Sequence, residues 1–189
     1  HLARSGTHKS QQTFRKQLER MRVRAQEVSH RIPGRKKLTP TDQAQFYSQW
    51  YYSAVRLLTS IPEFQTLNAI AQKLSFSKAK TREILDFLVS VGLCVEKEGR
   101  YKMGPTNTHI EASSPLVGRH HTNWRLQAIE RYDRLSETDL SFTAPITLSR
   151  KDFQTVRMMI LELIEKTAKT VKDSPSEELT FLNVDWIRF

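Results

Sequence analysis

Basic side chains gather in one segment of this 189-residue chain, at positions where they could bind an anion. Lys78, Lys80 and Arg82 fall in the first two turns of an expected helix that begins after Ser77. Residues at this end of a recognition helix contact base edges and phosphates of DNA, and Ser77 with its neighbouring backbone amides could bind a phosphate. Further basic residues lie at the end of the preceding helix and around the tip of an expected hairpin: Lys73, Lys97, Arg100 and Lys102. These eight residues form the predicted DNA-binding surface.

Acidic side chains are interspersed with these basic ones. Glu83 and Asp86 lie on or beside the outward face of the same expected helix, and Glu96 and Glu98 lie in the hairpin. The local charge is therefore only mildly positive, and the same segment could instead present a docking surface for another protein. Both interpretations stay open at the level of the sequence.

No other set of residues points to catalysis or to a cofactor. The chain has only six glycines, none of them clustered into a phosphate-binding loop. His120 and His121 are adjacent, so on a helix they point about 100° apart and cannot chelate one ion together; His109 and Glu111 upstream leave a weak metal hypothesis. Cys94, the single cysteine, is expected to be a small buried residue rather than a redox sensor. We therefore predict no enzyme, no metal site and no cofactor.

The elements expected to position the basic residues lie between Thr66 and Gly104. Thr66 and Ser77 are N-cap residues for two successive helices. Each helix has apolar residues at the spacing of one buried face: Leu67, Ile70, Ala71 and Leu74, then Ile84, Leu85, Leu88 and Val91. Gly92 suits the end of the second helix, and apolar residues then alternate around a Glu-Gly tip, as in a hairpin. The order helix, tight turn, helix, hairpin is typical of a winged helix-turn-helix, which most often places one helix in a DNA groove.

The net charge of +10 is unevenly distributed. Residues 1–44 hold 11 Lys/Arg against 3 Asp/Glu, residues 45–105 hold 8 against 5, and residues 106–189 hold 11 against 12. The positive charge thus lies in the N-terminal arm and around the predicted winged helix, which favours an anionic partner on that side. No apolar run approaches the length of a membrane span. One cysteine excludes an internal disulfide and fits a reducing cytoplasm.

The remaining patterns predict three regions in a mostly helical α+β chain. Residues 1–38 form a basic linker helix or arm. Residues 39–105 form the winged helix-turn-helix, entered by an aromatic helix that Thr39 caps and Pro62 ends. Residues 106–189 form a small α/β domain for dimerisation or sensing: a helix over 115–135, a strand over 140–148, a long helix capped by Ser149, and a terminal strand over 179–189 that is apolar on both faces.

Several segments together resemble one known family. They are FYSQWYYSAVRLL at Phe46–Leu58, the predicted winged segment, HHTNWRLQAIERYDRL at His120–Leu135, ITLSRKDF before the long helix, and the terminal LTFLNVDWIRF. This order resembles an uncharacterised family of bacterial paralogues, abundant in predatory and cellulose-degrading bacteria and described as transcriptional regulators. The resemblance implies a winged helix, a C-terminal α/β domain and self-association. Members of that family usually carry a further N-terminal helix-turn-helix, whereas this chain begins in what resembles the basic linker helix.

These observations lead to one expected function and one alternative. We expect a cytoplasmic bacterial transcription regulator that binds double-stranded DNA as a homodimer, with a C-terminal domain that pairs subunits or binds an unknown signal ligand. The alternative is a winged-helix protein-interaction module that does not itself read DNA. No membrane association is expected.

Overall fold

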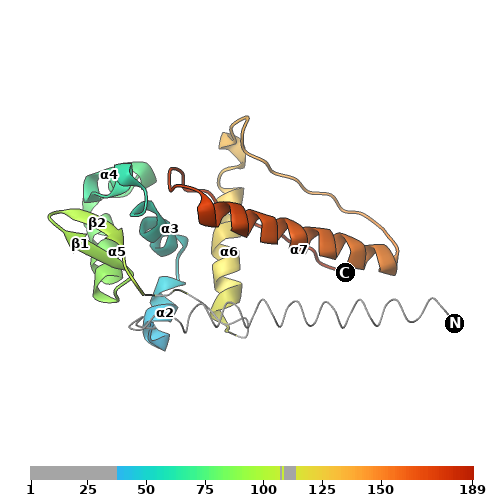
Figure 1. The fold of residues 1–189 in the computed structure, drawn as a ribbon, viewed down its shortest axis with the longest axis horizontal. Helices are drawn as coiled ribbons and strands as arrows, with labels where there is room; N and C mark the ends of the chain where they lie inside the picture. The colour runs from blue at the N-terminus through green and yellow to red at the C-terminus, as the bar shows by residue number, and fades with distance from the viewer. Residues whose placement is uncertain (1–37, 107, 109–113) are drawn as a thin grey trace.

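The computed structural model describes residues 38–106, 108 and 114–189. The predicted basic helix and arm lie outside the described residues. The chain is a mostly helical α+β protein, and its sheet, within the described residues, is one two-stranded antiparallel pair (Figure 1). Six α-helices accompany that pair in the described ranges.

The first half of the described chain is a compact unit with its own core. In order it contains α2 (Pro40–Phe46), α3 (Trp50–Leu58), the 3-10 turn η1 (Pro62–Phe64), α4 (Leu67–Leu74), α5 (Lys78–Ser90), β1 (Cys94–Lys97) and β2 (Arg100–Met103). The four α-helices of this unit and both strands contribute buried side chains, as do the residues between them. The core includes Leu58, Ile61, Ile70, Ile84, Leu85, Leu88 and Leu93. The predicted inward faces of α4 and α5 therefore lie in one core.

The predicted aromatic helix from Thr39 to Ile61 is wrong as a single helix. Thr39 begins α2 with the predicted cap, since its hydroxyl oxygen accepts a bond from the Asp42 amide at 3.2 Å. The helix ends at Phe46, and a new one starts after Gln49, whose backbone is extended. Phe46 and Tyr47 are 2% and 4% exposed. Two adjacent aromatic residues are thus buried directly before the break between α2 and α3.

The hairpin follows the predicted register. β1 and β2 pair from Cys94 opposite Met103 to Lys97 opposite Arg100. Glu98 and Gly99 form the tip with φ of 55° and 75°, which are the left-handed values of a two-residue hairpin turn. The hairpin is also joined to the segment before α4, because the Tyr101 amide donates to the Gln65 carbonyl at 2.8 Å.

The second half is built differently from the predicted α/β domain. It contains α6 (Leu116–Ile129), η2 (Tyr132–Arg134) and α7 (Arg150–Asp173), joined by an extended connector over 135–149 and followed by an extended tail over 174–189. The predicted strands over 140–148 and 179–189 are wrong, since within the residues that the structure describes neither extended segment has a strand beside it. The predicted helix over 115–135 ends at Ile129.

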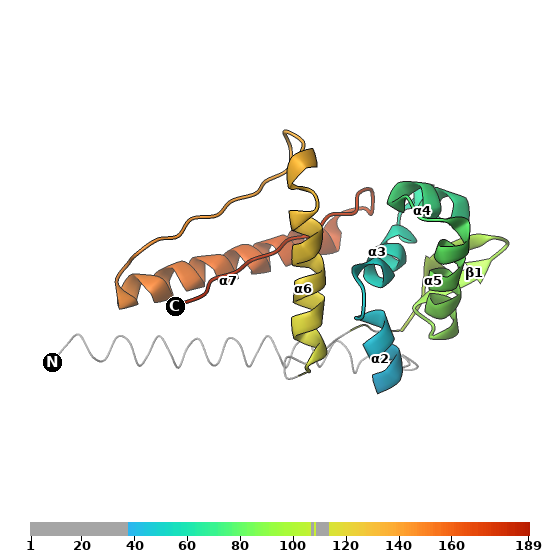
Figure 2. The same cartoon turned by 180° about the vertical axis from the view of Figure 1, so that it is seen from behind.

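The tail holds α6 and α7 together through side chains instead of a sheet. The Asn183 amide donates to the Trp124 carbonyl on α6, and the Trp186 indole donates to the Phe153 carbonyl on α7, both at 3.2 Å. Arg125 on α6 also pairs with Asp185 of the tail. α7 and the connector extend away from the unit that holds α2 to β2, as both views show (Figures 1 and 2).

Candidate nucleic-acid interface

The turn between α4 and α5 fixes where α5 begins. Ser75 ends α4 in the left-handed conformation with φ of 54°, and Ser77 then caps α5, its hydroxyl accepting the Lys80 amide at 3.2 Å. Between them the ring of Phe76 packs against Trp50 and Tyr51 of α3, with centroids 6.0 and 5.7 Å apart. The start of α5 is therefore held against the aromatic end of α3. Because Ser77 bonds within its own helix, it serves here as a cap.

α5 has one buried and one exposed face. Thr81, Ile84, Leu85 and Leu88 are buried, as the sequence pattern predicts for the apolar members of this set. Lys78, Arg82 and Asp86 lie four residues apart in succession, so they share one exposed stripe. Lys78 and Arg82 thus present two cations from the N-terminal half of the helix, the end at which recognition helices contact DNA.

Lys80 lies on a different part of α5. Its ammonium is 4.0 Å from the centre of the Phe76 ring and 4.5 Å from the centre of the Tyr51 ring. Both distances suit a cation–π interaction. The structure therefore places Lys80 over the aromatic cluster beside the turn, apart from the stripe of Lys78 and Arg82. Lys73, in the last turn of α4, lies in the same manner 5.3 Å from the Phe64 ring.

Arg100 anchors the hairpin. Its guanidinium donates to the Gln65 side-chain oxygen at 3.1 Å and to the Pro62 carbonyl at 3.4 Å. Its backbone also forms an isolated bridge with Thr66. Lys97 and Lys102 are exposed on the two strands. Of the three predicted hairpin contacts, Arg100 is therefore engaged with its own chain, while Lys97 and Lys102 face solvent.

Acidic groups approach the space between α5 and the hairpin. Burial raises the pKa of Tyr101 on β2, nearby Arg82 lowers it, and Glu96 and Asp86 raise it. All three charged groups therefore lie close enough to Tyr101 to act on its hydroxyl. Glu96 also accepts a bond from the Gly99 amide at 2.7 Å, across the hairpin tip. Arg82 therefore shares the surroundings of Tyr101 with two acidic side chains.

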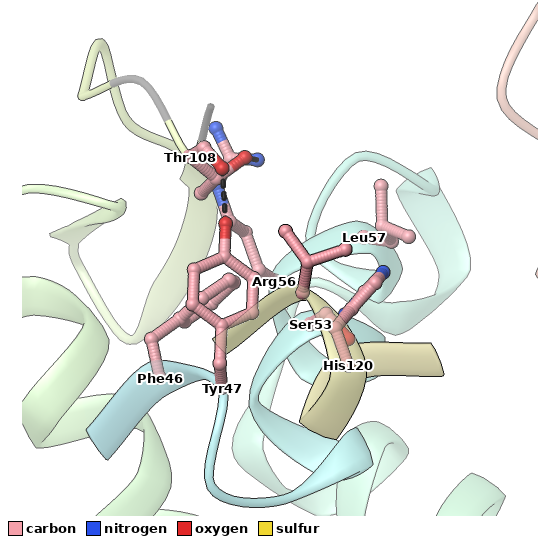
Figure 3. Close-up of a pocket in the computed structure, with 8 residues that line it drawn as sticks. Phe46, Tyr47, Ser53, Arg56, Leu57, Thr108 and His120 are labelled. Carbon is pink, nitrogen blue, oxygen red and sulfur yellow. Dashed lines mark hydrogen bonds between the residues drawn. The ribbon is translucent and has the colours of Figure 1, made fainter. Parts of the chain in front are cut away.

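A cavity that the sequence pattern did not predict lies where the first unit meets α6. It has a volume of about 420 Å³ and is lined by Phe46, Tyr47, Ser53, Arg56, Leu57, Thr108, Val117 and His120 (Figure 3). The Tyr47 hydroxyl donates to the Thr108 carbonyl, and the Arg56 guanidinium donates to the Thr106 carbonyl at 3.2 Å. Burial raises the pKa of Tyr47 to about 12, with the Thr108 bond and Arg56 opposing the shift. Because these two polar groups donate to the chain's own backbone, they hold the segment after β2 against α2 and α3. Arg56, the one charged residue of an aromatic helix, is the sequence signal that could have indicated it.

The two other groups considered for chemistry have structural surroundings. The His120 ring packs edge-on against Tyr47 with centroids 5.5 Å apart, and burial lowers its pKa, with His121 adding to the shift. The described part of the chain contains no group of three His, Cys, Asp or Glu side chains that could hold a metal ion; His109 and Glu111 lie outside it. Cys94 is buried, and burial raises its pKa to about 11, as suits a small core residue.

The fold and the candidate site together indicate a class of protein. The class is a mostly helical α+β protein that presents an exposed, basic-ended helix beside a two-stranded hairpin. The chain belongs to the family described as Domain of unknown function (DUF4423), which matches residues 33–187. No curated protein and no solved structure matches it. In the described residues, no helix is both long enough and apolar enough to cross a membrane.

Proposed function

We propose that residues 39–105 form a winged helix-turn-helix that binds double-stranded DNA, and that the chain is a transcription regulator. α5 enters the major groove with its N-terminal half foremost. The observation that carries the proposal is the pairing of Lys78 and Arg82 on one exposed stripe at that end of α5. Lys97 and Lys102 contact the neighbouring phosphates from the hairpin.

Two features of the fold support this orientation of α5. The Phe76 turn fixes the angle between α4 and α5 by packing on α3. The hairpin is fastened to the segment before α4 through the Tyr101–Gln65 backbone bond and through Arg100. A binding surface of this kind needs both parts held rigidly, because phosphate and base contacts require fixed register.

The experiment is a titration of labelled random-sequence duplex DNA at low salt. We expect Lys78→Ala/Arg82→Ala to weaken binding about tenfold or more, because each contact contributes on the order of 1 kcal/mol. The matched control is Lys166→Ala/Lys169→Ala, which removes two exposed cations from α7, outside the proposed DNA-binding surface. Equal affinity of the α5 variant and the control variant would remove α5 from the proposal.

The mixed charge between α5 and the hairpin favours one alternative, a protein-docking module. Asp86 and Glu96 lie near Arg82 around Tyr101, and an arrangement of both signs suits a complementary protein surface. If wild-type protein does not bind duplex DNA at low salt, while a partner retained after nuclease treatment is lost in Arg82→Ala/Asp86→Ala, the docking function replaces DNA binding.

A further inference from the structure

The apolar stripe of α7 is only partly covered by its own chain. Apolar side chains recur at helical spacing from Phe153 to Val171, yet none of the 24 residues of the helix is buried. The tail covers one part of the stripe, where the Trp186 ring stacks on Phe153 with centroids 5.0 Å apart. Met159 and Leu163, one turn apart, are 61% and 53% exposed. A surface helix normally buries such a stripe, so the described residues of one chain lack its cover.

The connector over 135–149 also exposes apolar side chains. Leu140, Phe142, Ile146 and Leu148 fall at even positions, and side chains two residues apart in an extended chain share a face. Leu140 is 91% exposed and Phe142 is 82% exposed. The connector runs along the length of α7 and is separated from it in both views (Figures 1 and 2). Among the described residues it is thus an extended apolar segment without a neighbouring strand, and most of its apolar side chains are exposed.

The exposed apolar area of this half is large enough for a stable dimer. Eleven large apolar side chains of the connector, α7 and the tail are at least 39% exposed: Leu140, Phe142, Ile146, Leu148, Met159, Leu163, Ile164, Val171, Leu182, Ile187 and Phe189. Spread over these three segments, they expose on the order of 1,000 Å² in total, given roughly 150–250 Å² for a fully exposed aromatic side chain and less for an aliphatic one. A standard interface buries about 800 Å² per partner, and the largest apolar patch of a typical monomer is about 300–600 Å².

We propose that a second copy of this chain covers this face, with the connector of each protomer packed on α7 of the other. A two-fold interface is reciprocal, because a surface that contacts a second surface on the partner is contacted by it in return. The described residues of one chain contain both a partly uncovered helix stripe and an extended segment without a neighbouring strand, and a second copy can cover the first with the second. Residues 106–189 hold 11 Lys/Arg against 12 Asp/Glu, so the two halves meet without strong repulsion. The interface is separate from α5 and does not depend on DNA binding.

The first test is the mass in solution, by light scattering over a dilution series. Wild-type protein is expected at twice the 22.0 kDa of one chain. Phe142→Glu and Leu163→Lys are each expected to weaken self-association at least about tenfold, because each places a charge in an apolar contact. Thr143→Glu beside Phe142 and Gln154→Lys elsewhere on α7 add the same charges to exposed positions outside the stripe and serve as controls.

A mixing experiment tests the reciprocal arrangement. When Phe142→Glu and Leu163→Lys proteins are combined, the mixed dimer has one wild-type connector–α7 contact and one in which opposite charges meet. We expect the mixture to associate at least about tenfold more tightly than either variant alone. Circular dichroism checks that both variants fold. A monomeric wild-type protein would overturn the proposal of a second copy, and a mixture no tighter than its components would overturn the exchange of connectors.

Discussion

The basic residues of the candidate interface differ in the contacts that their side chains make within the chain, and Lys80 is the clearest example. Its ammonium lies over the rings of Phe76 and Tyr51, an interaction that contributes about 0.5–1 kcal/mol at an exposed site. We expect Lys80→Ala to lower the free energy of unfolding by that amount and to weaken DNA binding less than Lys78→Ala does. Denaturant titrations and DNA titrations of the two variants measure both effects. Equal losses of DNA affinity would place Lys80 in the contact surface after all.

Cys94 predicts a pH dependence of stability. Burial raises the pKa of its thiol from 9.0 to about 11, with a bond to Thr59 and the charge of Arg56 opposing the shift. A raised pKa in the folded state means that its contribution to stability is fully present below pH 9 and is lost as the pH rises through 11. A pKa difference of about two units between the unfolded and the folded protein corresponds to at most about 3 kcal/mol of the free energy of unfolding.

The free energy of unfolding of wild-type protein should therefore fall more steeply than that of Cys94→Ala in this alkaline range. Below about pH 8 the two curves should run parallel, because the thiol is neutral in both states. Denaturant titrations at a series of pH values provide the comparison. Identical slopes above pH 9 would show that the thiol is not withdrawn from solvent.

At the scale of an element, two glycines with the same backbone angle form a matched pair. Gly92 follows α5 with φ of 74°, and Gly99 forms the hairpin tip with φ of 75°. A Cβ at Gly92 would lie 2.7 Å from the Thr106 hydroxyl oxygen, whereas one at Gly99 would meet nothing within 4 Å. We expect Gly99→Ala to cost about 1–2 kcal/mol from the backbone alone, and Gly92→Ala to cost clearly more.

Thermal or denaturant unfolding of the two glycine variants tests that order. Gly92→Ala in a Thr106→Ala background, compared with Thr106→Ala alone, serves as the control. Thr106→Ala by itself loses the hydroxyl bond to the Val91 carbonyl, and without the hydroxyl Gly92→Ala should cost only the backbone term. Equal losses in Gly92→Ala and Gly99→Ala would contradict the close approach between Gly92 and Thr106.

The starts of elements were the most predictable part of the fold. Thr39, Ser77 and Ser149 each accept the backbone amide three residues later, as their types indicate. The Glu-Gly tip placed the hairpin for a similar reason, because few residues adopt its positive φ. In each case a local hydrogen bond or a steric limit decides the structure, and both can be read from a few neighbouring residues.

The features that sequence patterns missed depend on contacts between distant residues. The break after Phe46 accompanies the burial of two adjacent rings, and Lys80 lies over rings from α3 and from the turn. The alternation over 140–148 did not produce a strand because a strand needs a neighbour, which the described residues of one chain do not supply. The candidate site was predictable as a helix with basic residues, while the distinction between Lys78 and Lys80 required the packing.

At the scale of the whole molecule, the described chain consists of two parts joined at α6. The first part has a buried hydrophobic core, whereas α7 and the connector of the second part carry exposed apolar side chains. The second part is held by side chains of its own tail, and α7 extends away from the first part (Figure 2). The Asn123 amide donates to the Tyr47 carbonyl at 3.1 Å across the joint, beside the cavity at Arg56. Under the two proposals, the first part binds DNA and the second part mediates dimerisation.

The most direct measurement is the salt dependence of duplex DNA binding by wild-type protein and by Lys78→Ala/Arg82→Ala. Each phosphate contact contributes about 0.9 to the slope of log affinity against log salt concentration. If both side chains contact phosphates, the slope for the double variant is shallower by roughly 2, and that for Lys166→Ala/Lys169→Ala is unchanged. Parallel lines for wild-type protein and the α5 variant, with equal affinity, would contradict DNA binding through α5.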